Sequence, residues 1–187
     1  MGVAWIYARA HRVLAVGACT LVLVALLWAS RDQSVGLGSA PVRLRWLVML
    51  AVGVLATAPL SPAFGEQEHT AVRPVAAAGA RCACALAMST TGFAGAVLTG
   101  DRHDVLLVWF TLVTVVGVGT AAVLPDQAWL VVLVVGGGSV LADHLALNLP
   151  VSRVVEPVGL PRSLGLLVLA TGLYLAAPAL RPFVRRR

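Results

Sequence analysis

The stretch VLLVWFTLVTVVGVGTAAVL, Val105–Leu124, decides the class of this fold. None of its residues is charged, and it is about 20 residues long, the length that a helix needs to cross the hydrocarbon core of a bilayer. Lipid offers no partner to backbone N–H and C=O groups, so such a stretch is stable as a helix, whose backbone hydrogen bonds are internal. We therefore expect Val105–Leu124 to be a transmembrane helix.

Apolar stretches of the same kind lie on both sides of it along the chain. They cover about 13–28, 46–60, 76–99, 128–147 and 163–180. Of the 187 residues, 59% are hydrophobic and 12% are charged, whereas soluble domains are about one quarter charged. The sequence thus predicts an all-α integral membrane protein, with six transmembrane helices in a single transmembrane domain, residues 1–187.

The first stretch has an alternative interpretation as a signal peptide. Arg9 and Arg12 precede it, and Val16–Cys19 loosely resembles a lipoprotein cleavage site. The apolar run continues well past Cys19, so cleavage there would leave its hydrophobic part behind. We expect the segment to be retained as a spanning helix.

Polar connections separate the expected helices. We expect irregular structure over 31–45 and 150–162, and the run from Glu66 to Pro74 is the most polar of the chain. A short Pro-Asp-Gln turn at 125–127 places Asp126 where it can cap the N-terminus of the fifth helix.

Small residues indicate where helices approach one another closely. Ala87, Thr91 and Gly95 recur every four residues, a spacing that lets a neighbouring helix pack against the backbone. The run Gly136, Gly137 and Gly138 lies in the middle of the fifth helix, where it predicts close backbone packing or a local break in that helix.

The arginine-rich end of the chain, with Arg181 and then 185–187, predicts a cytoplasmic C-terminus. An even number of spans places the N-terminus on the same side. The expected location is the cell (plasma) membrane, as a multi-pass protein with both termini cytoplasmic.

All 14 basic residues are arginine, so the chain has no lysine for the phosphate-binding loop of a P-loop ATPase. The formal charge of +6 is spread over short connections, which favours anionic lipid headgroups over nucleic acid as the counter-charge. Cys82 and Cys84 are separated by one residue and have no histidine nearby, which favours free thiols over a metal site. No cofactor is expected.

Membrane enzymes each lack a requirement. Ser139 and His144 lie on the same expected helix, whereas an intramembrane serine protease needs them on facing helices. There is no His-Glu-x-x-His motif for zinc, and the eight acidic residues are scattered rather than clustered for a divalent metal. We therefore expect a protein that is not an enzyme.

Asp143, His144 and Asn148 form an ionisable and polar cluster near the end of the fifth helix. One interpretation is an anchor at the headgroups, with Asp143 accepting hydrogen bonds from Arg153 or Arg162. This interpretation is favoured because the cost of a charge falls near the membrane surface. The other interpretation is a site that senses protons or substrate at the mouth of a pathway.

The run Leu60–Glu68, continuing to Arg73, Pro74 and Val75, resembles the coupling segment of small actinobacterial permease subunits of type-2 ABC exporters. The order of elements is similar as well: two spans, a Glu-containing segment and four further spans. The resemblance implies a type-2 ABC permease-like fold in which Glu66, Glu68 and Arg73 contact a separate P-loop ATPase subunit. It also implies a second permease copy or a paralogue, because six spans are too few to enclose a large passage.

The sequence hypothesis is therefore a permease subunit of an ABC-type exporter, energised in trans and moving an amphipathic or hydrophobic substrate. The alternative is a non-transport accessory or assembly subunit that packs against other membrane helices.

Overall fold

A computed structural model describes residues 13–29, 33–37, 40–61, 74–98, 104–144, 153 and 155–184. Helices make up most of this part of the chain. They are α2 Val13–Ala29, α3 Leu44–Thr57, α5 Pro74–Leu98, α6 Asp104–Val123, α7 Ala128–His144 and α9 Gly159–Val184. Two short 3-10 helices, η1 Ala58–Leu60 and η2 Pro125–Gln127, extend α3 and precede α7.

Four stretches are long and apolar enough to cross a membrane: Ala76–Leu98, Val105–Val123, Pro125–Ala142 and Gly159–Pro178. Two shorter apolar helices cover Ala15–Ala29 and Leu44–Leu60. The predicted all-helical fold with membrane-type helices is confirmed, while the count of six spans stays a prediction.

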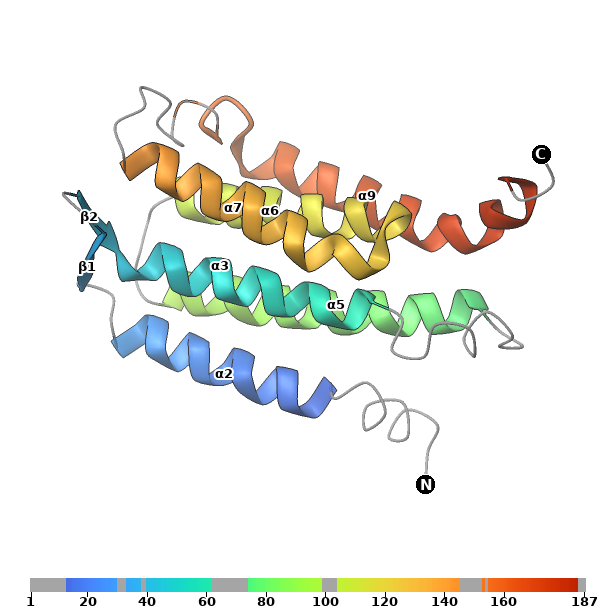
Figure 1. The fold of residues 1–187 in the computed structure, drawn as a ribbon, viewed down its shortest axis with the longest axis horizontal. Coiled ribbons are helices and arrows are strands. Elements are labelled where there is room, and N and C mark those ends of the chain that lie inside the picture. Colours follow the sequence, from blue (N-terminus) through green and yellow to red (C-terminus); the bar gives the residue numbers. More distant parts are fainter. Residues whose placement is uncertain are drawn as a thin grey trace.

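The helices lie side by side and alternate in direction (Figure 1). We call the end of the bundle with strands β1 and β2 the hairpin end, and the end with η1 and η2 the turn end. Helix α2 runs toward the hairpin end, α3 runs back, and the alternation continues to α9 (Figure 1). The beginning of α2 and the finish of α9 therefore both lie at the turn end.

A β-hairpin occupies the connection between α2 and α3, where we predicted irregular structure. Strands β1 Ser34–Leu37 and β2 Ala40–Arg43 pair antiparallel, with Ser34 opposite Arg43 and Leu37 opposite Ala40. The backbone N–H of Leu44 donates to the carbonyl oxygen of Gln33 at 3.0 Å, so the hairpin leads directly into α3. Only two residues separate the strands, a common length for a hairpin connection, but four-residue strands carry too short an alternation to be recognised from the sequence.

Helix α9 also differs from the prediction, because it begins at Gly159 rather than near Ser163 and continues to Val184. Gly159 has a φ of 64°, a conformation that glycine adopts without a steric cost. Pro161 follows in the first turn, where the missing N–H removes no intrahelical hydrogen bond.

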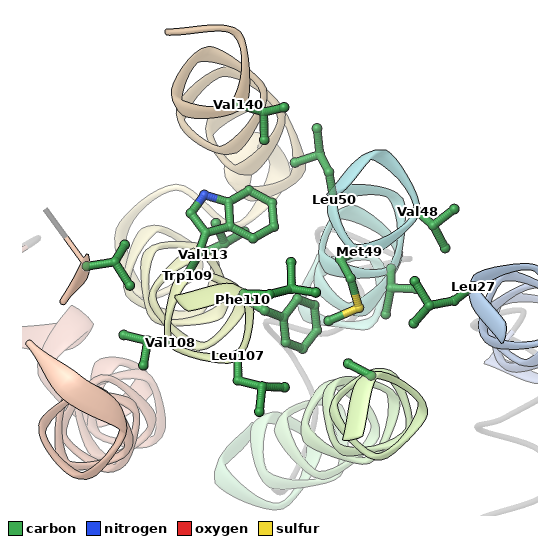
Figure 2. Close-up of a cluster of buried hydrophobic side chains, with 14 of the residues drawn as sticks. Leu27, Val48, Met49, Leu50, Leu107, Val108, Trp109, Phe110, Val113 and Val140 are labelled. Atoms are coloured by element: carbon green, nitrogen blue, oxygen red, sulfur yellow. The ribbon is translucent and has the colours of Figure 1, made fainter. Parts of the chain in front are cut away.

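Helices α3 and α6 form the centre of the bundle. Helix α3 contacts α2, α5, α6 and α7, and α6 also contacts α9. Figure 2 shows one apolar cluster between them, in which Met49 of α3 and Phe110 of α6 are fully buried. A second cluster nearer the turn end contains Leu60, Val118 and Tyr174.

The outer faces of the bundle are apolar as well. Side chains such as Val22 and Trp28 of α2, Val134 of α7, and Val168 and Leu169 of α9 are exposed. An exposed apolar surface of this extent is unusual for a soluble protein but is what lipid tails contact in a membrane.

Candidate functional site

The predicted docking residues Glu66, Glu68 and Arg73 lie outside the described residues. The chain before and after them is described: Ser61 follows η1, and Pro74 begins α5. Both positions lie at the turn end of the bundle, where α9 also finishes (Figure 1).

Asp143 and His144 are the last two residues of α7, at the hairpin end (Figure 1). Asn148 lies outside the described residues. Of the two predicted donors to Asp143, Arg153 is exposed, and Arg162 donates from Nη1 to the carbonyl oxygen of Pro157 at 2.9 Å. The role of this cluster stays a prediction.

Gly95 of the predicted small-residue stripe lies against α2. A Cβ atom at this position would come within 2.6 Å of Val24 Cγ1, so the two helices approach at the backbone of α5. Ala87 is exposed, and its carbonyl oxygen accepts a hydrogen bond from Thr91 Oγ1 at 2.8 Å. Thr91 itself is half-buried.

The glycine run of α7 lies within continuous helix. A Cβ atom at Gly136 would lie 2.6 Å from Leu50 Cδ1 of α3, and one at Gly137 would lie 3.6 Å from Leu50 Cδ2. Gly138 has open space around it. Helices α3 and α7 therefore approach at Gly136, while Gly138 points away from that contact.

Two further glycines, outside both predicted groups of small residues, lie at close approaches to α3. A Cβ atom at Gly92 of α5 would lie 2.6 Å from Val52 Cγ1, and one at Gly117 of α6 would lie 2.6 Å from Thr57 Cγ2. Four-residue spacing alone misses them, because a close approach depends on which helix lies opposite.

A group of three polar and aromatic side chains joins α3, α6 and α7. The indole Nε1–H of Trp109 donates to Ser139 Oγ at 2.8 Å, and that hydroxyl donates to the carbonyl oxygen of Gly136 at 2.7 Å. The ring of Trp46 meets that of Trp109 edge to face, with centroids 5.0 Å apart. Ser139 therefore uses its hydroxyl both as acceptor and as donor within the bundle.

At the turn end, Leu60, Ser61, Asp126 and Tyr174 form a second polar group, which we call the turn-end joint. Ser61 Oγ donates to Asp126 Oδ1 at 2.9 Å, and the Tyr174 hydroxyl donates to the carbonyl oxygen of Leu60 at 3.3 Å. Asp126 lies within η2, just before α7. A tyrosine in the middle of an apolar helix is the signal that could have identified this group, because its hydroxyl needs a partner when buried.

The remaining buried hydroxyl side chains of the described residues bind within their own helices. Each donates to a carbonyl oxygen three or four residues earlier, and they are Thr20, Thr57, Ser89, Thr111, Thr114 and Ser163. Within the described ranges, no three His, Cys, Asp or Glu side chains are grouped so that they could hold a metal ion. The described interior therefore offers packing surfaces and a few hydrogen-bonded links between helices.

Comparison with known proteins finds no matching family model, no similar curated protein and no similar solved structure.

Proposed function

We propose that this chain is the membrane-embedded permease subunit of an ABC-type exporter of the cell membrane, energised by a separate ATPase subunit. The observation that supports the proposal is the placement of the connection between Ser61 and Pro74. Both of its flanks lie at the turn end, the end at which α2 begins and α9 finishes (Figure 1).

The sidedness of the proposal rests on charge. The arginines that follow α9 favour a cytoplasmic C-terminus, since positively charged segments are retained inside. With six spans, both termini and the connection 62–73 are then cytoplasmic. In this orientation Glu66, Glu68 and Arg73 offer both signs of charge to a soluble ATPase.

We infer the substrate class from the surfaces of the bundle. Apart from Tyr174, whose hydroxyl donates to Leu60, the buried hydroxyl side chains of the described residues bind within their own helices, and the outer faces of α2, α7 and α9 are apolar. An amphipathic or hydrophobic substrate suits such faces better than a polar one. A second copy of the chain or a paralogue would supply the other wall of the passage.

The test is co-purification in nanodiscs with the P-loop ATPase whose gene lies nearest to that of this chain. We expect Glu66→Lys and Arg73→Glu to weaken ATPase binding at least tenfold, because each reverses a charge in the docking segment. Glu156→Lys is the matched control: Glu156 is exposed and lies three residues before α9, which begins at the hairpin end, so this variant should bind the ATPase normally. Normal ATPase binding by both docking variants would contradict the proposal.

The alternative, an accessory or assembly subunit without transport, is favoured by one feature of α9. Gly165 and Gly172 are seven residues apart on one face of α9, and nothing lies near the position of a Cβ atom at either. Small residues on a free helix face allow another membrane helix to approach closely. This alternative predicts stable membrane partners and no ATPase in the purified complex.

A further inference from the structure

The carbonyl group at the end of η1 needs a partner from elsewhere in the fold. Leu60 is fully buried, so its carbonyl oxygen has no access to water. It also lies at the end of a helix, where the last carbonyl groups have no intrahelical donor. The hydroxyl of Tyr174 supplies the hydrogen bond from α9, 114 residues further along the chain.

The next residue is bound to a different element. The backbone N–H of Ser61 donates to the carbonyl oxygen of Ala58 at 3.3 Å and closes η1. Its hydroxyl donates to Asp126 Oδ1 in η2, which leads into α7. Ser61 is half-buried and Asp126 is exposed, so this hydrogen bond lies at the surface of the turn end.

The part of α3 before η1 has little room to move within the bundle. Thr57 packs where a Cβ atom at Gly117 would lie, and Val52 packs where one at Gly92 would lie. Because packed interiors do not deform continuously, a force on the end of α3 acts on its last residues before it shifts the helix.

We propose that Leu60 and Ser61 transmit displacement of segment 62–73 to α9 and α7, through Tyr174 and Asp126 respectively. The proposal rests on the proposed function, in which an ATPase displaces that segment. Ser61 is covalently continuous with one end of the segment, as Pro74 of α5 is with the other, so a displacement of the Ser61 end acts on the two hydrogen bonds of the turn-end joint. Tyr174 and Asp126 are therefore positioning residues for coupling.

The test applies a load without an ATPase. In a variant whose three native cysteines are replaced, Gln67→Cys carries biotin, the protein is placed in nanodiscs, and streptavidin is added. Hydrogen exchange is then measured over η2 and over the α9 turn that contains Tyr174. We expect streptavidin to change the exchange of both regions at least twofold.

Ser61→Ala should abolish the response of η2, and Tyr174→Phe should abolish that of α9. Gln127→Ala, at an exposed neighbour of Asp126, is the matched control and should keep both responses. Ser61 is near the surface, so its variant tests the joint without a loss of folding, and thermal unfolding of each variant in the nanodisc verifies this.

The proposed coupling would be contradicted if the changes in hydrogen exchange persisted in both variants. It would also be contradicted if streptavidin caused no change in the protein with Ser61 and Tyr174 intact. The outcome is separate from that of the proposed function. If no ATPase binds but the changes in hydrogen exchange depend on Ser61 and Tyr174, the exporter proposal is wrong and the coupling through the turn-end joint is confirmed. If the ATPase binds and streptavidin changes no hydrogen exchange, only the proposed coupling through the turn-end joint is wrong.

Discussion

A single hydroxyl, that of Ser139, connects α7 to Trp109 of α6. Replacing Ser139 with alanine leaves the indole N–H of Trp109 without this acceptor inside the bundle. Hydrogen bonds between membrane helices are worth less than 2 kcal/mol, and an unsatisfied buried donor adds a penalty. We expect Ser139→Ala to lower the free energy of unfolding by about 1 kcal/mol, measured by denaturation in mixed micelles.

Ser89→Ala is the control for this prediction. Ser89 is buried as well, but its hydroxyl donates to the carbonyl oxygen of Ala85 in its own helix. Its loss leaves no donor of another helix unsatisfied. Equal destabilisation by both variants would mean that the Trp109–Ser139 hydrogen bond contributes nothing. In a Trp109→Phe background, Ser139→Ala should have a smaller effect, because the donor is already absent.

Individual residues were also the hardest to assign from the sequence. The sequence placed Ser139 and Asp126 in or beside the fifth helix, but their partners Trp109 and Ser61 lie 30 and 65 residues away. Contacts of such range depend on which helices are neighbours, and helical periodicity does not determine that. Glu66, Glu68 and Arg73 are known only from the sequence, so their role stays a proposal.

At the scale of elements, glycines set how closely the helices approach. Gly92 lies against Val52, whose β-branched side chain has little rotational freedom with which to move aside. We expect Gly92→Ala to destabilise the bundle by about 1–3 kcal/mol, the usual cost of overpacking a core. The measurement is the denaturation midpoint in the same micelles.

Gly119→Ala on α6 serves as the control, because nothing lies within 4 Å of its added Cβ atom. It should leave stability unchanged or raise it slightly, since alanine favours a helix over glycine. Gly136→Ala should fall between the two, because it meets only the end of the flexible Leu50 side chain at close range. If Gly92→Ala matched Gly119→Ala, the close approach of α5 to α3 would be refuted.

Elements were predicted well where long apolar runs define them. Each of the six predicted stretches is helical over most of its length, because apolar length alone favours a helix in lipid. The hairpin and the early start of α9 were missed. Both depend on short local features, a two-residue connection and the positive φ of Gly159, that a search for apolar runs does not register.

At the scale of the whole molecule, alternating helix directions predict which surfaces share a side of the membrane. Ser34 lies in β1 at the hairpin end, and Glu156 lies three residues before α9, which begins at that end. Gln127 lies in η2 at the turn end, and all three residues are exposed. If all six helices cross the bilayer, cysteines at Ser34 and Glu156 label from one side and a cysteine at Gln127 labels from the other. The measurement is labelling with a membrane-impermeant maleimide in intact cells and in inverted vesicles, in a background without native cysteines.

The short helices α2 and α3 make this experiment decisive. Only four stretches reach full spanning length, so the contrary outcome is that α2 and α3 lie together at one surface, which would also remove α3 from its packing against α6. In that arrangement Ser34, between α2 and α3, would label from the same side as Gln127, while Glu156 would still label from the opposite side. The six-span arrangement instead predicts that Ser34 follows Glu156 outside, because each short helix must then cross once. Because arginine-rich segments stay on the cytoplasmic side, the turn end is expected to be cytoplasmic. A cysteine at Gln127 should therefore be labelled only in inverted vesicles. Labelling of Gln127 from outside intact cells would place the connection 62–73 outside too, away from any ATPase.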